Sequence, residues 1–281
     1  MNSNPVVAEP SWSPQRILAE MRLKVVHHIP VVDANRVIIG LATLDELAGI
    51  IQHPNWVVLM AGGLGSRLWP LTENCPKPML HIGGKPILEN ILESFVEQGF
   101  CKFFISVNYM AESIIDYFGD GSRWGVSINY LHEKKRLGTA GALSLLPSRP
   151  QHPFFVMNGD LLTTLRFDSM LRFHGEHGAS ATMAVREYDF QVPYGVVRMD
   201  GNRIESLDEK PVHKFFVNAG IYVLSPEAMS SIQIDQRLDM PNLFDQITRN
   251  GAIASAFLLR EYWLDIGRLD EYEKAQNEWK N

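Results

Sequence analysis

The stretch MAGGLGSRLWPLTENCPKP, residues 60–78, decides the fold, because it joins an apolar run to a glycine-rich loop that carries two cations. The run WVVLM at 56–60 is typical of a buried β-strand. Three glycines follow it, and Arg67 comes soon after them. Two prolines then flank Lys77 and fix the backbone on both sides of it. The stretch predicts a strand, an anion-binding loop of backbone N–H groups, and a lysine held in a defined place.

Two nucleotide-binding motifs do not fit this loop. A dinucleotide fingerprint needs a third glycine where Leu68 stands. A Walker A loop is absent too, because Gly84-Lys85 is followed by Pro86. On its glycines alone, the loop is also compatible with a tight turn whose arginine and lysine are merely solvated.

Outward from the loop, apolar runs alternate with segments of helical periodicity. In ILENILESFVEQGF, residues 87–100, the apolar side chains recur on one helical face, and Gly99 is placed to end the helix. This alternation predicts an α/β fold, a Rossmann-like, mostly parallel mixed sheet covered by helices on both faces. Such sheets bind ligands beyond the carboxyl ends of their strands. The other expected strands are KFFISVNY, VSINYL, FFVMNGD, SATMAV and FFVNAGIYVL.

The chain before this region predicts a small α+β unit. Residues 1–15 are rich in Pro, Ser and Asn and are expected to be flexible. Residues 16–53 indicate a helix, two short strands around the turn Asp33-Ala34-Asn35, and a second helix from about Thr43. QHPNW at 52–56 breaks the pattern, so we expect a larger domain to occupy residues 56–281.

Composition narrows the class of protein. The chain has 281 residues, 46% of them hydrophobic, and a net charge of -6, which fits a globular protein and argues against a nucleic-acid partner. Cys75 and Cys101 belong to no CxxC pair, so reduced thiols are expected. No apolar stretch of about 18 residues and no signal-peptide pattern occur, so we expect a cytoplasmic protein without a membrane partner. A homo-oligomer stays possible.

The motif G-G-x-G-S-R-L-x-P-L-T…P-K-P, from Gly62 to Pro78, resembles the signature of the nucleoside-diphosphate-sugar pyrophosphorylases, which are sugar-1-phosphate nucleotidyltransferases. The resemblance runs from about Trp56 to the C-terminus. It implies the nucleotide-diphospho-sugar transferase fold and attack by a sugar 1-phosphate on the α-phosphorus of a nucleoside triphosphate. Because the second pKa of a phosphate monoester is near 6, the nucleophile is already anionic and needs no general base. The chemistry then rests on positioning and charge neutralisation.

The resemblance also assigns catalytic and triphosphate-binding residues. It implies that Arg67 contacts the departing phosphates and that Lys77 bridges the α-phosphate and the sugar phosphate. The loop backbone would receive the triphosphate, through Ala61, Gly62, Gly63, Gly65 and Ser66.

Two aspartates are candidates for a metal site. Asp160 closes the apolar run FFVMNGD, and Asp265 stands among apolar neighbours in YWLDIG. Each alone is also consistent with a turn or cap residue. Both match metal-binding positions of the family, so the resemblance implies an Mg²⁺ site, and Mg²⁺ with phosphates needs only one or two carboxylates.

Three further segments match the sugar-binding parts of the family. They contain Gly195, Glu209-Lys210 and Asn218. The resemblance implies that Lys210 contacts the sugar phosphate, that Glu209 and Asn218 contact hydroxyls, and that Gly195 makes room. Glu209-Lys210 by itself also fits a solvated charge pair.

The segment from Glu133 to Gly141 resembles the base-binding part of the family, with Gly138 and Thr139 opening a helix. A carboxylate at Glu133 would accept hydrogen bonds from guanine N1–H and the exocyclic amine. GTP is therefore favoured, with UTP and CTP as alternatives.

The small N-terminal unit resembles one CBS motif, carried by HIPVVD at 28–33 and GLATLDEL at 40–47. It departs from the pattern in lacking a clear first strand and in reading Glu46 where the usual ribose contact has Asp. The combination resembles the CBS-fused guanylyltransferases of bacterial surface-sugar pathways, which supports GTP. This partial unit is compatible with nucleotide sensing and with packing or dimerisation.

The leading hypothesis is an enzyme that makes an NDP-sugar and pyrophosphate from a nucleoside triphosphate and a hexose, hexosamine or heptose 1-phosphate, for surface-polysaccharide or glycan biosynthesis. A non-catalytic regulatory homologue that binds a sugar nucleotide is the main alternative. An NAD-dependent oxidoreductase is a weaker one, because its fingerprint is broken.

Overall fold

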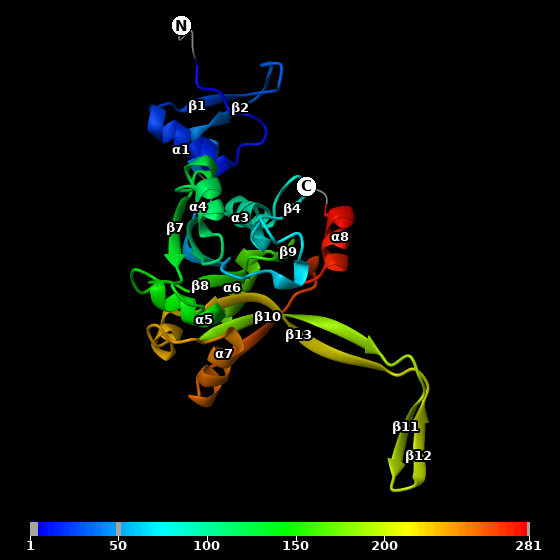
Figure 1. Ribbon diagram of the computed structural model, residues 1–281. Coiled ribbons are helices and arrows are strands. Elements are labelled where there is room, and N and C mark those ends of the chain that lie inside the picture. Colours follow the sequence, from blue (N-terminus) through cyan, green and yellow to red (C-terminus); the bar gives the residue numbers. More distant parts are fainter. Residues whose placement is uncertain (1–4, 49–51, 280–281) are drawn as a thin grey trace.

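The computed structural model describes residues 5–48 and 52–279. Figure 1 shows three parts: a small N-terminal unit, a central α/β body, and an arm of two long strands that leaves the body and ends in a hairpin. The body holds most of the buried side chains.

A seven-stranded mixed sheet forms the centre of the body, in the order β14-β10-β13-β8-β3-β6-β7. Strand β3 pairs in parallel with β6 and β8, and β6 pairs in parallel with β7. Strand β13 is antiparallel to both β8 and β10, whereas β14 is parallel to β10. The mixed sheet confirms the predicted fold class. The strands are β3 (His53–Met60), β6 (Phe100–Val107), β7 (Ser127–His132), β8 (Phe154–Asn158), β10 (Ala181–Gln191), β13 (Val212–Leu224) and β14 (Ala254–Leu258).

Helices cover both faces of this sheet, as predicted. Along β3, Val57 and Leu59 join one buried cluster, and Val58 joins the other, because successive side chains of a strand point to opposite faces. The first cluster includes side chains of α3 (Ile87–Glu97), α4 (Ala111–Phe118), α6 (Phe167–Glu176) and α8 (Leu269–Glu278). The second includes side chains of α5 (Gly138–Gly141) and α7 (Met240–Arg249).

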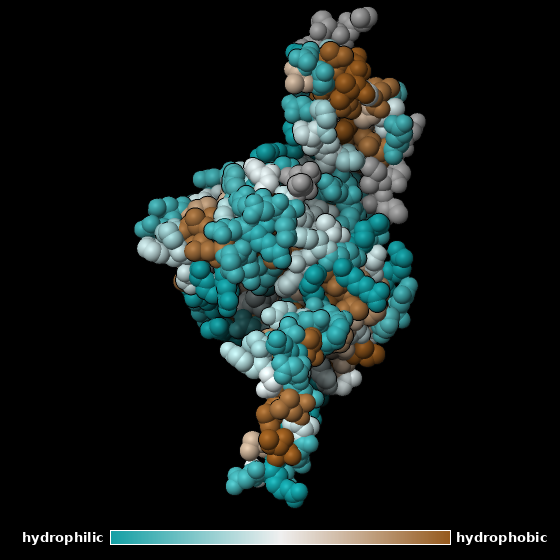
Figure 2. All heavy atoms as spheres, turned by 90° about the vertical axis from the view of Figure 1, so that its right-hand side faces the viewer, coloured by the Kyte–Doolittle hydropathy of each residue, from teal (hydrophilic) through white to brown (hydrophobic). Residues whose placement is uncertain are grey.

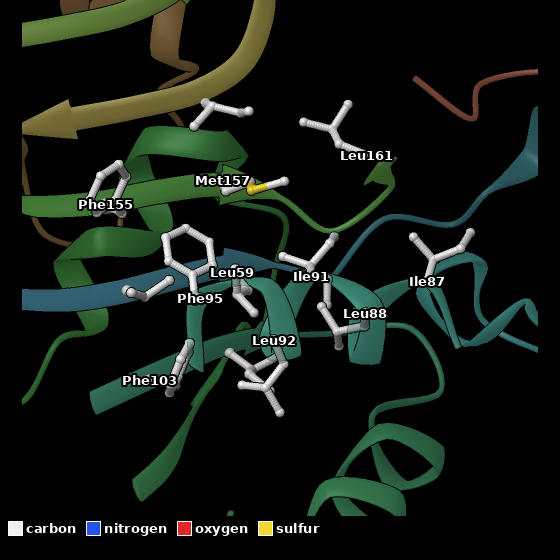
Figure 3. Close-up of a cluster of buried hydrophobic side chains, with 14 of the residues drawn as sticks. Leu59, Ile87, Leu88, Ile91, Leu92, Phe95, Phe103, Phe155, Met157 and Leu161 are labelled. Atoms are coloured by element: carbon white, nitrogen blue, oxygen red, sulfur yellow. The ribbon is translucent and has the colours of Figure 1, made fainter. Parts of the chain in front are cut away.

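Helix α3 anchors the larger cluster (Figure 3). Phe95 stacks on Phe167 with ring centroids 3.6 Å apart and meets Phe100 and Phe155 edge-on. The helix ends before Gly99, whose φ of 91° suits a residue without a side chain. The predicted apolar face and helix end are both confirmed.

The N-terminal unit contains α1 (Pro14–Lys24), β1 (His28–Val32), β2 (Ile38–Thr43) and α2 (Leu44–Ala48), in the predicted order. Thr43 and Glu46 exchange hydrogen bonds between side chain and backbone N–H, which is a capping box at the start of α2. This box gives a structural reason for Glu at position 46.

The expectation for residues 1–15 needs correction. Fully buried Ala8 forms a bridge with Val31, so the expected flexible segment of residues 1–15 is ordered at least there, while residues 1–4 lie outside the described residues. The pattern break expected at QHPNW falls at the start of β3, where the ring of His53 stacks on Phe100.

The arm comprises residues 186–217. Its two long strands pair in continuous antiparallel register from Arg186 and Val217 to Gln191 and Val212. Beyond them lies a hairpin of β11 (Val196–Asp200) and β12 (Arg203–Asp208). In Figure 1 this hairpin is the part of the structure farthest from the N-terminal unit.

Candidate active site

The candidate site lies where β3 and β8 end side by side. The amide of Gly159 donates to the carbonyl of Met60 at 2.9 Å, and a Cβ on Gly159 would lie only 2.7 Å from that oxygen. The missing side chain lets the two strand ends approach each other. The glycine loop after β3 and Asp160 after β8 therefore meet at one edge of the sheet, as expected for parallel neighbours.

Lys77 is held in this site by the backbone around it. Pro76 is extended and precedes a 3-10 turn, η2 (Lys77–Met79), in which the lysine side chain is buried. Its Nζ donates to Oδ2 of Asp160 at 2.5 Å. Lys77 thus lies in a defined place between the two prolines.

Gly65 packs directly against that lysine. Its φ is 64°, in the left-handed region, and a Cβ there would lie 2.9 Å from Cβ of Lys77. The Thr72 hydroxyl donates to the carbonyl of Gly65 at 2.9 Å and closes the loop. Of the three glycines, Gly65 is the one whose conformation the site requires.

The second candidate metal ligand, Asp265, is brought to Asp160 by a two-stranded ladder. Strands β9 (Leu161–Thr163) and β15 (Trp263–Asp265) are antiparallel and pair Asp265 with Leu161, and the amide of Ile266 donates to the carbonyl of Asp160 at 3.0 Å. Burial and then the nearby carboxylate of Asp160 raise the pKa of Asp265, while Lys77 opposes them. A cation between the two carboxylates would relieve this repulsion.

The donor set fits Mg²⁺ bound with a phosphate ligand. Among the described residues, no group of three or more His, Cys, Asp or Glu is arranged to hold a metal by itself. Mg²⁺ commonly takes one or two carboxylates and completes its shell with water and substrate phosphates. Asp160 and Asp265 supply that number.

Arg67 reaches the same edge from the short turn η1 (Ser66–Leu68). A Cβ built on Gly267 would lie 3.5 Å from a guanidinium nitrogen of Arg67, so a glycine there leaves room for it. The charge of Arg67 also acts on Asp265, lowering its pKa against the stronger effect of burial. The structure thus brings together Arg67, Lys77, Asp160 and Asp265.

A cavity of 290 Å³ adjoins this group of charges. Six of its lining residues were expected in the site from the sequence, and these are Gly62, Gly63, Glu133, Gly138, Thr139 and Asp160. Four others that sequence reasoning missed are Arg136, Asn158, Arg237 and Asp239.

Glu133 stands in the cavity wall in a fixed orientation. One carboxylate oxygen accepts from the hydroxyl of Ser106 at 2.6 Å, and the other accepts from the amide of Leu137 at 2.9 Å. A Cβ on Gly62 would lie 3.0 Å from the first oxygen, so Gly62 gives the carboxylate access to the loop. Each oxygen keeps further acceptor capacity for a ligand.

Asp239 joins the two segments that close the cavity on its other side. Its carboxylate accepts from the amide of Thr139 at 3.2 Å, and the hydroxyl of Thr139 accepts from the amide of Met240 at 2.9 Å. Asp239 directly precedes α7, which has a proline in its first turn, and this helix-start signal would have drawn attention to it. The sequence carries no comparable signal for Arg237.

The expected sugar-binding residues are not all near this cavity. Asn218 lies at the base of the arm, where its amide group donates to the hydroxyl of Tyr222 and accepts from the amide of Gly220. Gly195, Glu209 and Lys210 lie within the arm, where the two long strands join the terminal hairpin. Since a strand rises about 3.3 Å per residue, the segment from Asn218 to Val212 spans about 20 Å. The structure therefore separates Gly195, Glu209 and Lys210 from Lys77.

The two cysteines do not belong to the site. Cys75 and Cys101 are free thiols, and burial raises the pKa of both, which makes them weak nucleophiles. Within residues 5–48 and 52–279, no helix is both long and apolar enough to cross a bilayer.

Comparison with protein families gives two matches. Residues 56–281 match the model of the family described as nucleotidyl transferase, and residues 1–53 match that of the CBS domain.

Named relatives and solved structures agree with the first match. The chain is 36% identical over 225 residues to the mannose-1-phosphate guanylyltransferase catalytic subunit beta of Danio rerio, and 34% identical to mannose-1-phosphate guanyltransferase beta-B of Xenopus laevis. Each alignment covers 76% of this chain but only 62% of the relative. The crystal structure of HddC from Yersinia pseudotuberculosis superposes with a TM-score of 0.61 at 28% identity, covering 80% of this chain and all of HddC. A second structure, HddC complexed with GMP-PN, gives 0.62 at 27% identity, with the same coverage of both chains.

Proposed function

Because the chain belongs to the nucleotidyl transferase family, we propose that it condenses GTP with a sugar 1-phosphate to give a GDP-sugar and pyrophosphate. An oxygen of the sugar phosphate forms a bond to the α-phosphorus, and the bond from that phosphorus to the oxygen bridging to the β-phosphate breaks. The observation that carries the proposal is the meeting of Lys77, Asp160 and Asp265 beside a glycine loop and a cavity.

Catalysis in this proposal is done by position and charge. Buried Lys77 has its ammonium already aimed into the site by Asp160, so little reorganisation is needed when phosphates arrive. The glycine loop supplies backbone N–H groups to the triphosphate, and Arg67 is placed to neutralise the leaving pyrophosphate. The attacking phosphate oxygen is anionic at neutral pH, so no side chain has to remove a proton.

We propose Asp160 and Asp265 as the ligands of Mg²⁺. Their two half-buried carboxylates repel each other in the free protein and would both be neutralised by one divalent cation. When bound, Mg²⁺ would stabilise negative charge on the phosphates.

We propose guanine as the base because of Glu133 and the relatives. Glu133 is a fixed acceptor in the cavity wall, which suits the two donors on one edge of guanine. Two relatives are named guanylyltransferases or guanyltransferases, and the structure of HddC holds GMP-PN. Glu133→Gln should raise the KM for GTP at least about tenfold by replacing an acceptor with a donor. Glu273→Gln, at an exposed position of α8 away from the cavity, is the matched control.

We propose a mannose-like hexose, hexosamine or heptose 1-phosphate as the acceptor, because the relatives at 34–36% identity are named for mannose 1-phosphate. In this proposal residues 56–281 carry the reaction and residues 16–53 form a partial CBS-like unit. The chain spans 62% of the length of those relatives.

Pyrophosphate release tests the proposal. The purified chain with Mg²⁺ is given each of ATP, GTP, UTP, CTP and dTTP, in combination with mannose, glucosamine and heptose 1-phosphates. GTP with one of these sugars should give the highest kcat/KM. Preference for UTP or CTP would overturn the choice of base, and no release from any pair would overturn the proposed activity.

A further inference from the structure

The arm has one apolar face and one charged face, and the charged face also carries exposed Phe216 and Val212. Residues directly opposite each other in an antiparallel ladder share a face, so Tyr188 lies beside Phe215, and Phe190 follows on the same side. These three side chains are 54%, 52% and 50% exposed. On the other face, Nζ of Lys214 lies 2.5 Å from a carboxylate oxygen of Glu187.

The hairpin at the end of the arm repeats this pattern. Val197 pairs with Leu207, and Met199 pairs with Ile204, so that all four side chains share one face and all are exposed. On the opposite face an ion pair joins β11 to β12. Figure 2 shows apolar residues gathered on this lower end of the molecule.

Such a surface is unstable in water when nothing covers it. An isolated two-stranded ribbon is marginally stable at best, and contiguous exposed apolar patches mark interaction sites when they are large. The arm therefore requires a partner that buries the face of Tyr188, Phe190 and Phe215.

The arm also carries residues that the proposed reaction needs beside Lys77. Lys210 matches a sugar-phosphate contact of the family and Glu209 a hydroxyl contact, yet both lie between β12 and β13, beyond the outer end of the long ladder. The ladder is unbroken from Val185 to Gln191, so the arm is a continuous ribbon that keeps Glu209 and Lys210 away from its base.

The mouth of the site presents apolar side chains of its own. Leu64, Trp69 and Leu71 are 41%, 65% and 39% exposed, and they lie on the loop that also carries Arg67. An apolar surface therefore flanks the cations and the cavity, and the apolar face of an arm can pack on it.

From these observations we propose that the arm of one chain covers the active site of a second copy. Its apolar face would pack on Leu64 and Trp69 of that copy and bring Glu209 and Lys210 to the sugar 1-phosphate beside Lys77. Reciprocal exchange gives a two-fold dimer with two composite sites, because the same two surfaces are used by each copy. This inference rests on the proposed function for the assignment of Glu209 and Lys210.

Paired variants distinguish an arm that crosses to the second chain from an arm that folds back onto its own chain. Lys77→Ala damages only the body part of a site, and Lys210→Ala damages only the arm part. The two chains are co-expressed with different tags and purified as a heterodimer. Exchange leaves one of its two sites intact, so pyrophosphate release should reach about half the wild-type rate per dimer. The heterodimer of wild type with the Lys77→Ala/Lys210→Ala chain should be nearly inactive.

The opposite pattern would overturn the exchange. In that pattern the heterodimer of the Lys77→Ala chain with the Lys210→Ala chain is nearly inactive, and the heterodimer of wild type with the double variant is half active. A wild-type chain that is inactive with every substrate pair would instead refute the proposed function. The two failures are thus distinguishable.

Oligomeric state tests the surface without any assay of activity. In sedimentation equilibrium the wild-type chain should be a dimer. Tyr188→Ser/Phe215→Ser should weaken the dimer about a hundredfold or more, because two large apolar anchors are lost. Lys214→Ser, on the charged face, should change the dimer constant less than about twofold. A monomeric wild type, or equal effects of the two changes, would contradict the proposal.

Discussion

The ammonium nitrogen of Lys77 lies 2.5 Å from a carboxylate oxygen of Asp160, although the two residues are 83 positions apart in the chain. The pair joins η2 to the segment that follows β8 at the carboxyl edge of the sheet. It holds a buried cation in place before any substrate binds. When substrate binds, its phosphates would interact with the Lys77 ammonium, and a metal would interact with the Asp160 carboxylate. These two charges neutralise each other in the free protein.

Removing the Lys77 ammonium should abolish most of the turnover. Charge-assisted hydrogen bonds are worth about 1.5–3 kcal/mol each, so Lys77→Ala is expected to lower kcat about a hundredfold or more. Lys77→Arg should also be impaired, because a planar guanidinium does not fit the buried position of an ammonium. Steady-state pyrophosphate release measures both.

The control for this lysine is Lys274→Ala. Lys274 makes an exposed ion pair within α8, so its loss should leave kcat within about twofold of wild type. If Lys77→Ala kept full activity, Lys77 would have no part in catalysis.

The two aspartates should share one metal. EDTA is expected to abolish turnover, and added Mg²⁺ should restore it. Asp160→Asn and Asp265→Asn should each raise the Mg²⁺ concentration for half-maximal rate about tenfold or more, because each removes one anionic ligand. Titration of Mn²⁺ with the nucleotide, followed by electron paramagnetic resonance, reports the same loss of binding.

The exposed Asp270 at the start of α8 provides the comparison. Asp270→Asn should leave the metal dependence unchanged. Wild-type metal affinity in the double variant Asp160→Asn/Asp265→Asn would refute this metal site.

The glycines of the loop should differ in their tolerance of alanine. Gly65→Ala places a Cβ at positive φ and 2.9 Å from Cβ of Lys77, so it should cost about 1–3 kcal/mol of unfolding free energy and also lower kcat. Gly63→Ala meets no atom within 4 Å and should be stable. Denaturant unfolding of the two variants checks this difference, and equal unfolding midpoints would contradict it.

Acid should destabilise the fold through His174. This buried side chain contacts the hydroxyls of Thr182 and Ser225, and burial lowers its pKa from 6.5 to about 4. Between these two values the unfolded chain binds the proton more readily than the native one, so stability falls as pH decreases from 6.5 towards 4. The loss from this group should approach about 3 kcal/mol.

A substitution isolates this contribution. In His174→Gln the decrease in unfolding free energy between neutral pH and pH 4 should be smaller than in wild type. His177→Gln, at an exposed position, should keep the wild-type dependence. Identical slopes for His174→Gln and wild type would show that His174 is not the acid-sensitive group.

The sequence predicted the parts of the structure that depend on local chemistry. The face of α3 follows from its periodicity, and the position of Lys77 follows from the prolines on either side. The meeting of Asp160 with Asp265 was implied only by resemblance, because the β9–β15 ladder that produces it joins segments 100 residues apart.

Other features depend on the course of the whole chain and could not be predicted. SATMAV and FFVNAGIYVL read correctly as strands, but their extension into an arm is set by pairing register and not by periodicity. The same register separates Glu209 and Lys210 from Lys77. Arg237 lines the cavity because α7 packs against α5, and its own neighbourhood in the sequence carries no signal.

Pyrophosphate release from GTP and mannose 1-phosphate in the presence of Mg²⁺ tests the proposed nucleotidyl transfer most directly. The wild-type chain should form one GDP-sugar for each pyrophosphate released, and Lys77→Ala, folded to the same melting temperature within about 4 °C, should form about a hundredfold less. Absence of both products from the wild-type chain with GTP and every sugar 1-phosphate tested would contradict the proposed reaction.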